Sequence, residues 1–424
     1  MNRIHYPQLD ETVYSRVLEN GLTVKVVTRP GFTKRLAYFV TDFGSIHTDF
    51  VFEGQKYHVP AGIAHYLEHK MFDLPGDRDV SREFASWGAV TNAFTSYDMT
   101  AYYFSCTENF DKCLRLLLEF VSTPYFTEET VAKEQGIIDQ EIGMSLDSPD
   151  NQIFERLMEA AYHAHPVRVP ILGTSETIRQ ITAETLHLCH RAFYTPGNMM
   201  LCVIGDVDPA EVESIALDVL GSQPSPVAEK CRDWQEPLTC PRKFTTRSME
   251  VAMPSFSMAF KCDPLPKGSE GIRQEMVADL AAEALFGESS PLYLKMYEEG
   301  LIDSAFGGGF ETLDGCAMLM CSGDSETPEQ VRDAILARAA ELAETGIPEE
   351  NFLRMKRSAL GRRIRELDSF DSTCFRLCAY HLSDFDYFAF PGIYQQITRE
   401  EIREFLGRVV REEHCSLSVI TPLT

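Results

Sequence analysis

Short stretches of this 424-residue chain recur about 216–221 residues further on. A repeat of that length predicts two copies of one domain in place of a single large one. The matching stretches are 201–204 with 417–420 and 181–184 with 397–400, both shifted by 216 residues, and 128–129 with 349–350, shifted by 221. Because the three shifts nearly agree, the duplication limits the fold more than any other feature of the sequence.

The pattern within each copy mixes strands and helices. Apolar runs flank the turn pair Asn20-Gly21, which favours a β-hairpin over residues 13–27. Residues 110–122 carry an apolar stripe at helical spacing. We therefore expect an α+β fold of two similar domains, each a mainly antiparallel sheet packed with helices. The expected domains are residues 1–221 and 244–424, joined by a proline-rich linker at 222–243.

The first copy contains the sequence His65-Tyr66-Leu67-Glu68-His69, a His-x-x-Glu-His motif. On a helix, residues four apart lie on the same face, so His65 and His69 can hold one metal ion. Glu68 falls on that face as well, within reach of a water on the metal. Two imidazoles and a carboxylate predict a catalytic zinc site, in which zinc acidifies the water and the carboxylate takes its proton. The non-functional alternative is an amphipathic helix whose two histidines bind no metal.

A catalytic zinc ion has three protein ligands, so a third ligand is needed. Residues 128–142 read as a helix that begins after Thr127 and carries Glu134 and Glu141. These two glutamates are two turns apart, which places their Cα atoms about 10 Å apart along one face. Only one of them can readily bind the metal, and the other would act on a ligand or on substrate. A solvated acidic stripe remains the ordinary alternative.

Taken together, the motif and the Glu-x6-Glu helix about 70 residues later resemble the pitrilysin/insulinase family of zinc metallopeptidases. The similarity covers most of residues 14–210. Its other matching stretches are 62–72, 91–96, 165–166, 173, 193–199 and 205–207. The subgroup that it most resembles comprises half-size bacterial members, similar to the mitochondrial processing peptidase, some of them linked to elongation factor P modification or peptide maturation.

The resemblance implies roles for particular residues. It implies that zinc is held by His65, His69 and Glu141, with Glu68 as general base and Glu134 as a supporting carboxylate. It also implies that the strand near residues 91–96 is an edge strand that binds substrate. We expect Asn92, Ala93 and Phe94 there to contact a peptide added as an extra strand.

The family also supplies an arginine and, seven residues later, a tyrosine that stabilise the developing oxyanion. The matching stretch here is residues 293–304, where Met296 or Tyr297 takes the arginine position and Asp303 the tyrosine position. The pair is therefore absent, and the second copy has no histidine motif. We expect the chain to act as half of an enzyme, in a heterodimer with a related metal-free subunit that carries the pair. A homodimer would still lack it.

Composition narrows the possible partners and compartment. A net charge of −25 argues against nucleic acid and against anionic membrane surfaces. No run of about 18 apolar residues is present, and the start of the chain lacks the apolar segment of a signal peptide. The 12 cysteines form no Cys-x-x-Cys pair, which favours free thiols in a bacterial cytoplasm.

The sequence thus predicts a zinc endopeptidase subunit that cleaves unfolded peptides or short precursors. The first rival is a non-catalytic assembly subunit of the same fold, like the family's respiratory-complex core subunits. A second rival is a zinc hydrolase that acts on a modified side chain or small amide. Manganese or cobalt in place of zinc also stays open.

Overall fold

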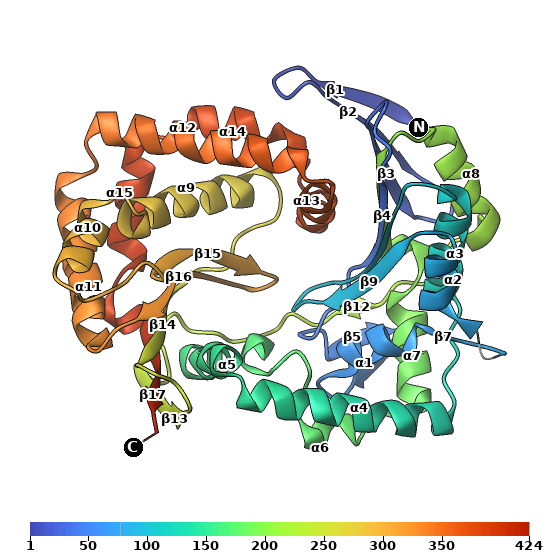
Figure 1. The fold of residues 1–424 in the computed structure, drawn as a ribbon, viewed down its shortest axis with the longest axis horizontal. Helices are drawn as coiled ribbons and strands as arrows, with labels where there is room; N and C mark the ends of the chain where they lie inside the picture. Colours follow the sequence, from blue (N-terminus) through green and yellow to red (C-terminus); the bar gives the residue numbers. More distant parts are fainter. Residues whose placement is uncertain (77, 424) are drawn as a thin grey trace. The chain divides into compact units, whose positions relative to one another are not determined.

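The computed structural model describes residues 1–76 and 78–423. By its internal contacts the chain divides into two compact units that interleave along the sequence. Unit 1 comprises Met1–Ile142, Pro170–Cys231 and Ile364–Ala389, and unit 2 comprises Gly143–Val169, Arg232–Arg363 and Phe390–Thr424. Each unit is described separately below (Figure 1).

Unit 1 is built on a seven-stranded sheet in the order β1-β2-β3-β11-β4-β10-β9. Only the β3–β11 pair is parallel, and β9 is a free edge. The strands are β1 Asn2–Tyr6, β2 Glu11–Val17, β3 Thr23–Thr28, β4 Arg35–Thr41, β9 Val90–Thr95, β10 Thr100–Cys106 and β11 Met199–Gly205. Smaller sheets pair β12 Glu229–Lys230, β5 Asp49–Phe52 and β6 Gln55–His58 in that order, and β7 Asp73–Leu74 with β8 Arg78–Asp79.

Helices cover both faces of this sheet. The main apolar core fills one face, where α1 and α3 pack, and α13 lies on the opposite face against β4 and β11 (Figure 1). The helices are α1 Ile63–Lys70, α2 Val80–Ser86, α3 Phe110–Ser122, α4 Glu128–Asp147, α6 Ser175–Ile178, α7 Ala183–Phe193, α8 Pro209–Leu220 and α13 Phe370–Leu382. Helix α4 continues past Ile142 into the segment assigned to unit 2.

Unit 2 holds a five-stranded sheet in the order β13-β17-β14-β16-β15. Its strands are β13 Phe244–Met249, β14 Ser255–Cys262, β15 Gly307–Leu313, β16 Cys316–Asp324 and β17 Cys415–Pro422. Its helices are α5 Pro149–Ala161, α9 Ser269–Phe286, α10 Pro291–Glu298, α11 Pro328–Thr345, α12 Glu349–Arg365, α14 Phe390–Gln396 and α15 Arg399–Val409. Short 3-10 turns complete the chain at Pro166–Arg168, Pro196–Asn198, Glu366–Asp368, Tyr387–Ala389 and Glu412–His414.

The two sheets share one topology, which confirms the predicted α+β fold and its internal duplication. The order β3-β11-β4-β10-β9 corresponds to β13-β17-β14-β16-β15, and in both only the first pair is parallel. The repeated segments found in the sequence fall on equivalent elements: β11 with β17, α4 with α12, and α7 with α15. Helices α7 and α15 even begin with the same capping box, at Thr182 and Thr398.

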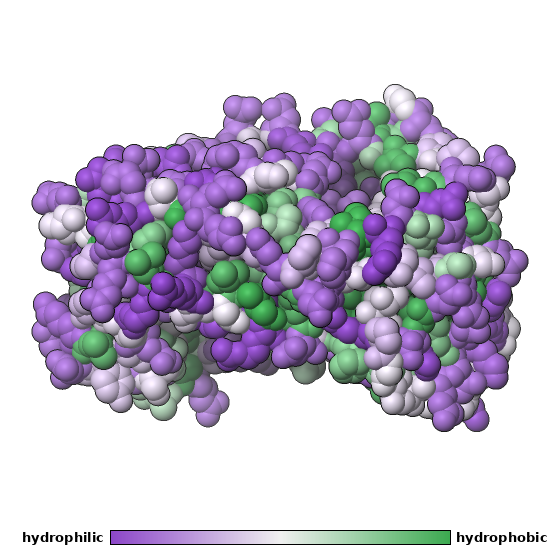
Figure 2. Space-filling view, turned by 90° about the horizontal axis from the view of Figure 1, so that it is seen from above, coloured by the Kyte–Doolittle hydropathy of each residue, from purple (hydrophilic) through white to green (hydrophobic). Residues whose placement is uncertain are grey.

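The units exchange one helix each. Helix α5 follows α4 in the sequence but packs on β13, β14 and β17 in unit 2. Helix α13 follows α12 but packs on β4 and β11 in unit 1. A compact unit is therefore not a continuous half of the chain. In the face shown by Figure 2 hydrophilic residues predominate, with hydrophobic residues in several smaller patches, as the high charge of the chain would suggest.

Candidate metal centre

Helix α1 presents the His-x-x-Glu-His residues on one face and is anchored on the other. The buried side chains of Ala64, Tyr66 and Leu67 join the apolar core of unit 1. The Tyr66 hydroxyl donates a hydrogen bond to the Val131 carbonyl, at 2.5 Å, and so ties α1 to α4. Packing of this face leaves His65, Glu68 and His69 half-buried on the other face.

The start of α1 depends on a glycine. Gly62 is the N-cap residue and has φ of 92°, a left-handed conformation that glycine adopts without strain. A Cβ at this position would lie 2.5 Å from the Leu172 carbonyl oxygen. Gly173 is equally close from the other side, since its Cβ would lie 2.5 Å from the Ala61 carbonyl oxygen. Two glycines thus let the loop before α6 approach the first turn of the motif helix.

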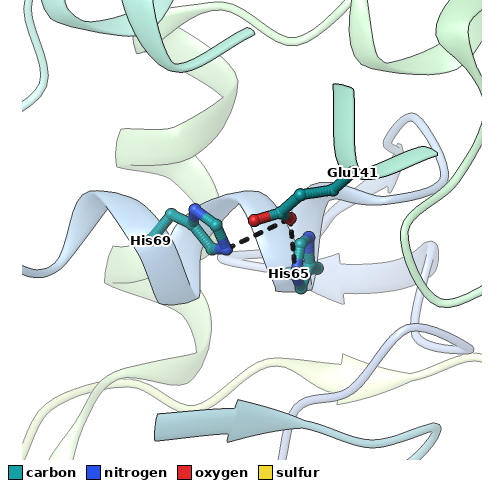
Figure 3. A group of neighbouring side chains, drawn as sticks. All are labelled: His65, His69 and Glu141. Carbon is teal, nitrogen blue, oxygen red and sulfur yellow. Dashed lines mark ion pairs between the residues drawn. The ribbon is translucent and has the colours of Figure 1, made fainter. Parts of the chain in front are cut away.

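Helix α4 brings its two glutamates to different atoms of the site. The Glu141 carboxylate lies 3.7 Å from His65 Nε2 and 3.6 Å from His69 Nε2 (Figure 3). Glu134 is hydrogen-bonded to the other nitrogen of the second ring, with Oε1 2.9 Å from His69 Nδ1. The two carboxylates therefore meet different nitrogens of the histidines, and the role of each stays a prediction.

The geometry of the three residues matches a zinc site. Nitrogen or oxygen ligands of zinc lie about 2.0–2.2 Å from the ion, so two ligands of a tetrahedral centre are about 3.4 Å apart. The two nitrogen-to-oxygen distances above are close to that value, and one ligand atom from each of His65, His69 and Glu141 lies within 4.8 Å of the others. Three protein ligands leave a fourth position for water or substrate, which is the pattern of a catalytic zinc site.

The electrostatics of the metal-free chain differ between the two histidines. Burial, and then the neighbouring His69 ring, lower the pKa of His65 to about 4, so that imidazole is neutral and able to bind metal at neutral pH. Burial also lowers the pKa of His69, but the hydrogen bond that His69 donates to Glu134 and the nearby carboxylates outweigh burial and raise that pKa. Conversely, the His69 hydrogen bond outweighs burial at Glu134 and lowers the pKa of its carboxyl.

Glu68 is held by the strand beside it. The Thr95 hydroxyl donates a hydrogen bond of 2.6 Å to Glu68 Oε2. Burial raises the pKa of Glu68, and the Thr95 hydrogen bond partly offsets that rise. A carboxyl with a raised pKa beside a metal centre is suited to accept a proton from water at neutral pH.

The expected substrate residues lie on edge strand β9, on alternating faces. Ala93 packs toward the core beside α1, on the same face as Thr95. Phe94 points to the other face, where the centroid of its ring lies 6.4 Å from that of Tyr103 and 5.9 Å from that of Phe375 of α13. Asn92 is exposed at the edge. Any contact of these residues with a peptide stays a prediction.

Thr95 is the residue that the sequence reasoning missed. The expected strand at 91–96 contained it, and the period of two along a strand places residues 91, 93 and 95 on one face. What the sequence did not supply was which of the two faces lies against α1. No other chemical signal in the sequence distinguishes Thr95 from Thr91.

Comparison with known proteins identifies the family. Residues 53–175 match the model described as insulinase (peptidase family M16), and residues 180–359 match the model described as the peptidase M16 inactive domain. The uncharacterized zinc protease YmfH of Bacillus subtilis is 37% identical over 427 residues, with 99% of both chains covered. A crystal structure described as an M16-like peptidase from Alicyclobacillus acidocaldarius has a TM-score of 0.93 at 33% identity, covering 97% of this chain and 99% of that one.

A more distant structure shares the fold alone. The periplasmic protease PqqL of Escherichia coli has a TM-score of 0.73 at 18% identity, and this chain spans 48% of its length. In the described part of the chain no helix combines the length and apolar character that crossing a bilayer requires. Full-length similarity to YmfH, the two family models and the shared fold agree: the chain belongs to the insulinase family of peptidases, family M16.

Proposed function

We propose that this protein is the zinc-bearing subunit of an endopeptidase that cleaves unfolded peptides or short precursors. The observation that carries the proposal is the convergence of His65 Nε2, His69 Nε2 and the Glu141 carboxylate on one point, with Glu68 beside it. Zinc at that point would supply Lewis-acid activation of a water molecule and of the substrate carbonyl. YmfH, which carries the name zinc protease, is similar over its full length.

Residues near the proposed metal site have separate proposed roles in proton transfer and in orienting the ligands. Glu68 accepts the proton of the attacking water and later returns it to the leaving amine. Glu134 accepts a hydrogen bond from His69 Nδ1–H, which fixes the tautomer that leaves Nε2 free for metal. His65 has no such partner at its buried Nδ1 within residues 1–76 and 78–423, so no hydrogen bond at that nitrogen fixes the tautomer of this ring.

The substrate would bind to β9 as an additional antiparallel strand. This strand is one of the two edge strands of the seven-stranded sheet, the other being β1, and it runs beside α1, which carries the motif. Backbone hydrogen bonds to an edge recognise an extended chain more than its sequence. Alternate side chains of the peptide would then face Ala93 on one side and Asn92 and Phe94 on the other.

A related subunit without zinc would complete the enzyme. The positions expected to carry an arginine and a tyrosine hold Met296 or Tyr297, and Asp303. Met296 is buried in α10, whereas Tyr297 and Asp303 are exposed. This chain also spans about half of the single-chain protease PqqL. Both facts favour a heterodimer, with residues 1–221 and 244–424 as the two duplicated domains and 222–243 as their linker. We place it in a bacterial cytoplasm because its 12 cysteines form no Cys-x-x-Cys pair.

The alternative is a non-catalytic subunit of the same fold. A chain in the structure of complex III from Candida albicans shares this fold, with a TM-score of 0.75 at 13% identity. A scaffold has no need for His65, His69, Glu141 and Glu68 together in one constellation. The convergence of all four therefore favours the peptidase.

The test is cleavage of a fluorogenic peptide library by the wild type and by Glu68→Gln, each with its zinc content measured. We expect one zinc per chain in both proteins and loss of cleavage in the variant, because the glutamine cannot accept a proton. Addition of a related chain that carries the arginine and tyrosine should raise wild-type cleavage sharply. Undiminished cleavage by Glu68→Gln would refute the assigned base, and equal activity with and without the second chain would refute the heterodimer.

A further inference from the structure

We propose that Thr95 is a positioning residue for catalysis, whose hydroxyl holds the Glu68 carboxylate in the orientation needed to take a proton from water. The inference rests on the proposed role of Glu68 as general base. It assigns a function to a residue of β9 that is not one of the proposed metal ligands. It also gives the two oxygens of Glu68 different tasks.

The hydrogen-bond pattern fixes the direction of donation. A threonine hydroxyl carries one proton. The Thr100 hydroxyl, which is fully buried, donates its proton to the Phe43 carbonyl at 2.9 Å. Thr95 and Thr100 approach at 3.5 Å between hydroxyl oxygens, a longer contact than the 2.6 Å between Thr95 Oγ1 and Glu68 Oε2. The Thr95 proton is therefore directed to Glu68.

This donation separates the two carboxylate oxygens. Oε2 accepts the bond from the Thr95 hydroxyl, and we assign to Oε1 the proton of the attacking water. The Thr95 backbone N–H also bonds to this carboxylate, and that bond is kept when only the Thr95 side chain is changed. A hydrogen bond to an ionised acceptor is short and strong compared with one between neutral groups. It restrains the last torsion of the glutamate side chain, which is otherwise broad. Thr95 thus limits the carboxylate to one orientation before the reaction begins.

The position of Thr95 links the base to the substrate strand. Thr95 is the last residue of β9, in register with Thr100 of β10. A peptide that adds to the edge of β9 would bond to the backbone of the same strand. The base and the bound peptide would then be positioned by one rigid element, which is the arrangement that keeps reacting groups within fractions of an ångström.

The chain offers a matched control four residues earlier. Thr91 lies on the same strand and the same face, and its side chain is also half-buried. Its hydroxyl donates to the Tyr103 carbonyl at 3.0 Å and not to a catalytic group. Thr91→Val and Thr95→Val therefore remove the same atom from the same strand, and only the second removes a donor to Glu68.

The first experiment compares peptide cleavage by the wild type, Thr95→Val, Thr95→Ser and Thr91→Val, with zinc content measured in each. We expect kcat to fall by about 10–100-fold in Thr95→Val, a part of the 10²–10⁴-fold contribution typical of general base catalysis. KM should stay within about twofold, because the valine keeps the strand and its backbone. Thr95→Ser should restore kcat to within about threefold of the wild type. Thr91→Val removes no donor to Glu68, so kcat should stay at the wild-type value even where KM changes through the substrate strand. Equal kcat in Thr95→Val and Thr91→Val would overturn the inference.

The second experiment does not depend on activity. Crystal structures of the zinc-loaded wild type and of Thr95→Val should show one Glu68 orientation in the first and a rotated or divided carboxylate in the second. An unchanged Glu68 in Thr95→Val would overturn the inference even if the chain needs a partner to cleave peptides. The proposed function fails separately, through absence of zinc or through undiminished cleavage by Glu68→Gln.

Discussion

The glycine that begins α1 provides a sharp test of how the fold builds the site. In Gly62→Ala the new Cβ would lie 2.5 Å from the Leu172 carbonyl oxygen, 3.0 Å from Leu172 C and 3.2 Å from Gly173 Cα. All three are backbone atoms, which cannot rotate away. We expect the first turn of α1 and the loop at Leu172 to separate, with a loss of stability and a displaced His65.

A matched glycine isolates the steric part of this cost. Gly54, in the turn between β5 and β6, has φ of 78°, and its Cβ would meet nothing within 4 Å. An alanine in the left-handed region costs about 1–2 kcal/mol at either position, and the reduced entropy of the unfolded chain offsets part of that cost equally in both. The overpacking at Gly62 adds about 1–3 kcal/mol, so Gly62→Ala should be the less stable variant by that amount.

The assay is urea unfolding followed by circular dichroism, with zinc content measured on the same samples. We expect a clearly lower midpoint for Gly62→Ala than for Gly54→Ala, and reduced zinc content only in Gly62→Ala. Equal midpoints for the two variants would refute the claim that contact with Leu172 sets the start of the motif helix. Normal zinc in a destabilised Gly62→Ala would show that the ligands do not depend on that start.

Three further predictions concern the metal site, the pH dependence and the thiols. Glu134→Gln should weaken zinc binding by about 10–100-fold in competition with a chelator, because His69 loses its anionic acceptor. The control Glu129→Gln, at an exposed position of the same helix, should leave zinc affinity unchanged. Equal affinities of the two variants would contradict the role of Glu134. Burial lowers the pKa of His190 to about 4, below its unfolded value of about 6.5, so the unfolding free energy should lose up to about 3 kcal/mol as pH falls from 6.5 to 4. In urea titrations His190→Asn should lack this part of the slope, and an unchanged slope would contradict the assignment. None of the 12 cysteines is in a disulfide, and ten of them are buried. A thiol reagent should therefore label at most about two quickly in the native protein and all of them in urea; a persistent disulfide in the purified protein would contradict this.

The elements that local sequence determines were predictable. Helix α3 was expected at residues 110–122 and spans Phe110–Ser122. Its apolar stripe and the residues at its two ends indicate the same helix limits. The expected start of α4 after Thr127 is confirmed at Glu128, where the backbone N–H of Thr130 donates to the Thr127 hydroxyl. The repeat also anticipated the shared topology of the two sheets, since duplicated sequence folds into duplicated packing.

The features that depend on long-range packing were not predictable. Nothing in the local pattern of α5 or α13 indicates that each packs in the unit of the other half. Helical spacing placed Glu134 and Glu141 on one face, but only the register of α4 against α1 decides which nitrogen each carboxylate meets. The same holds for Thr95, whose role depends on which face of β9 lies against α1.

The central claim is that His65, His69 and Glu141 hold a catalytic zinc ion. The most direct measurement is an anomalous difference map from crystals of the purified protein, recorded on both sides of the zinc absorption edge. We expect one peak about 2.0–2.2 Å from His65 Nε2, His69 Nε2 and a Glu141 oxygen, which should be lost in Glu141→Ala. An absent peak in the wild type after zinc is supplied, or a peak bound by Glu134 in place of Glu141, would contradict it.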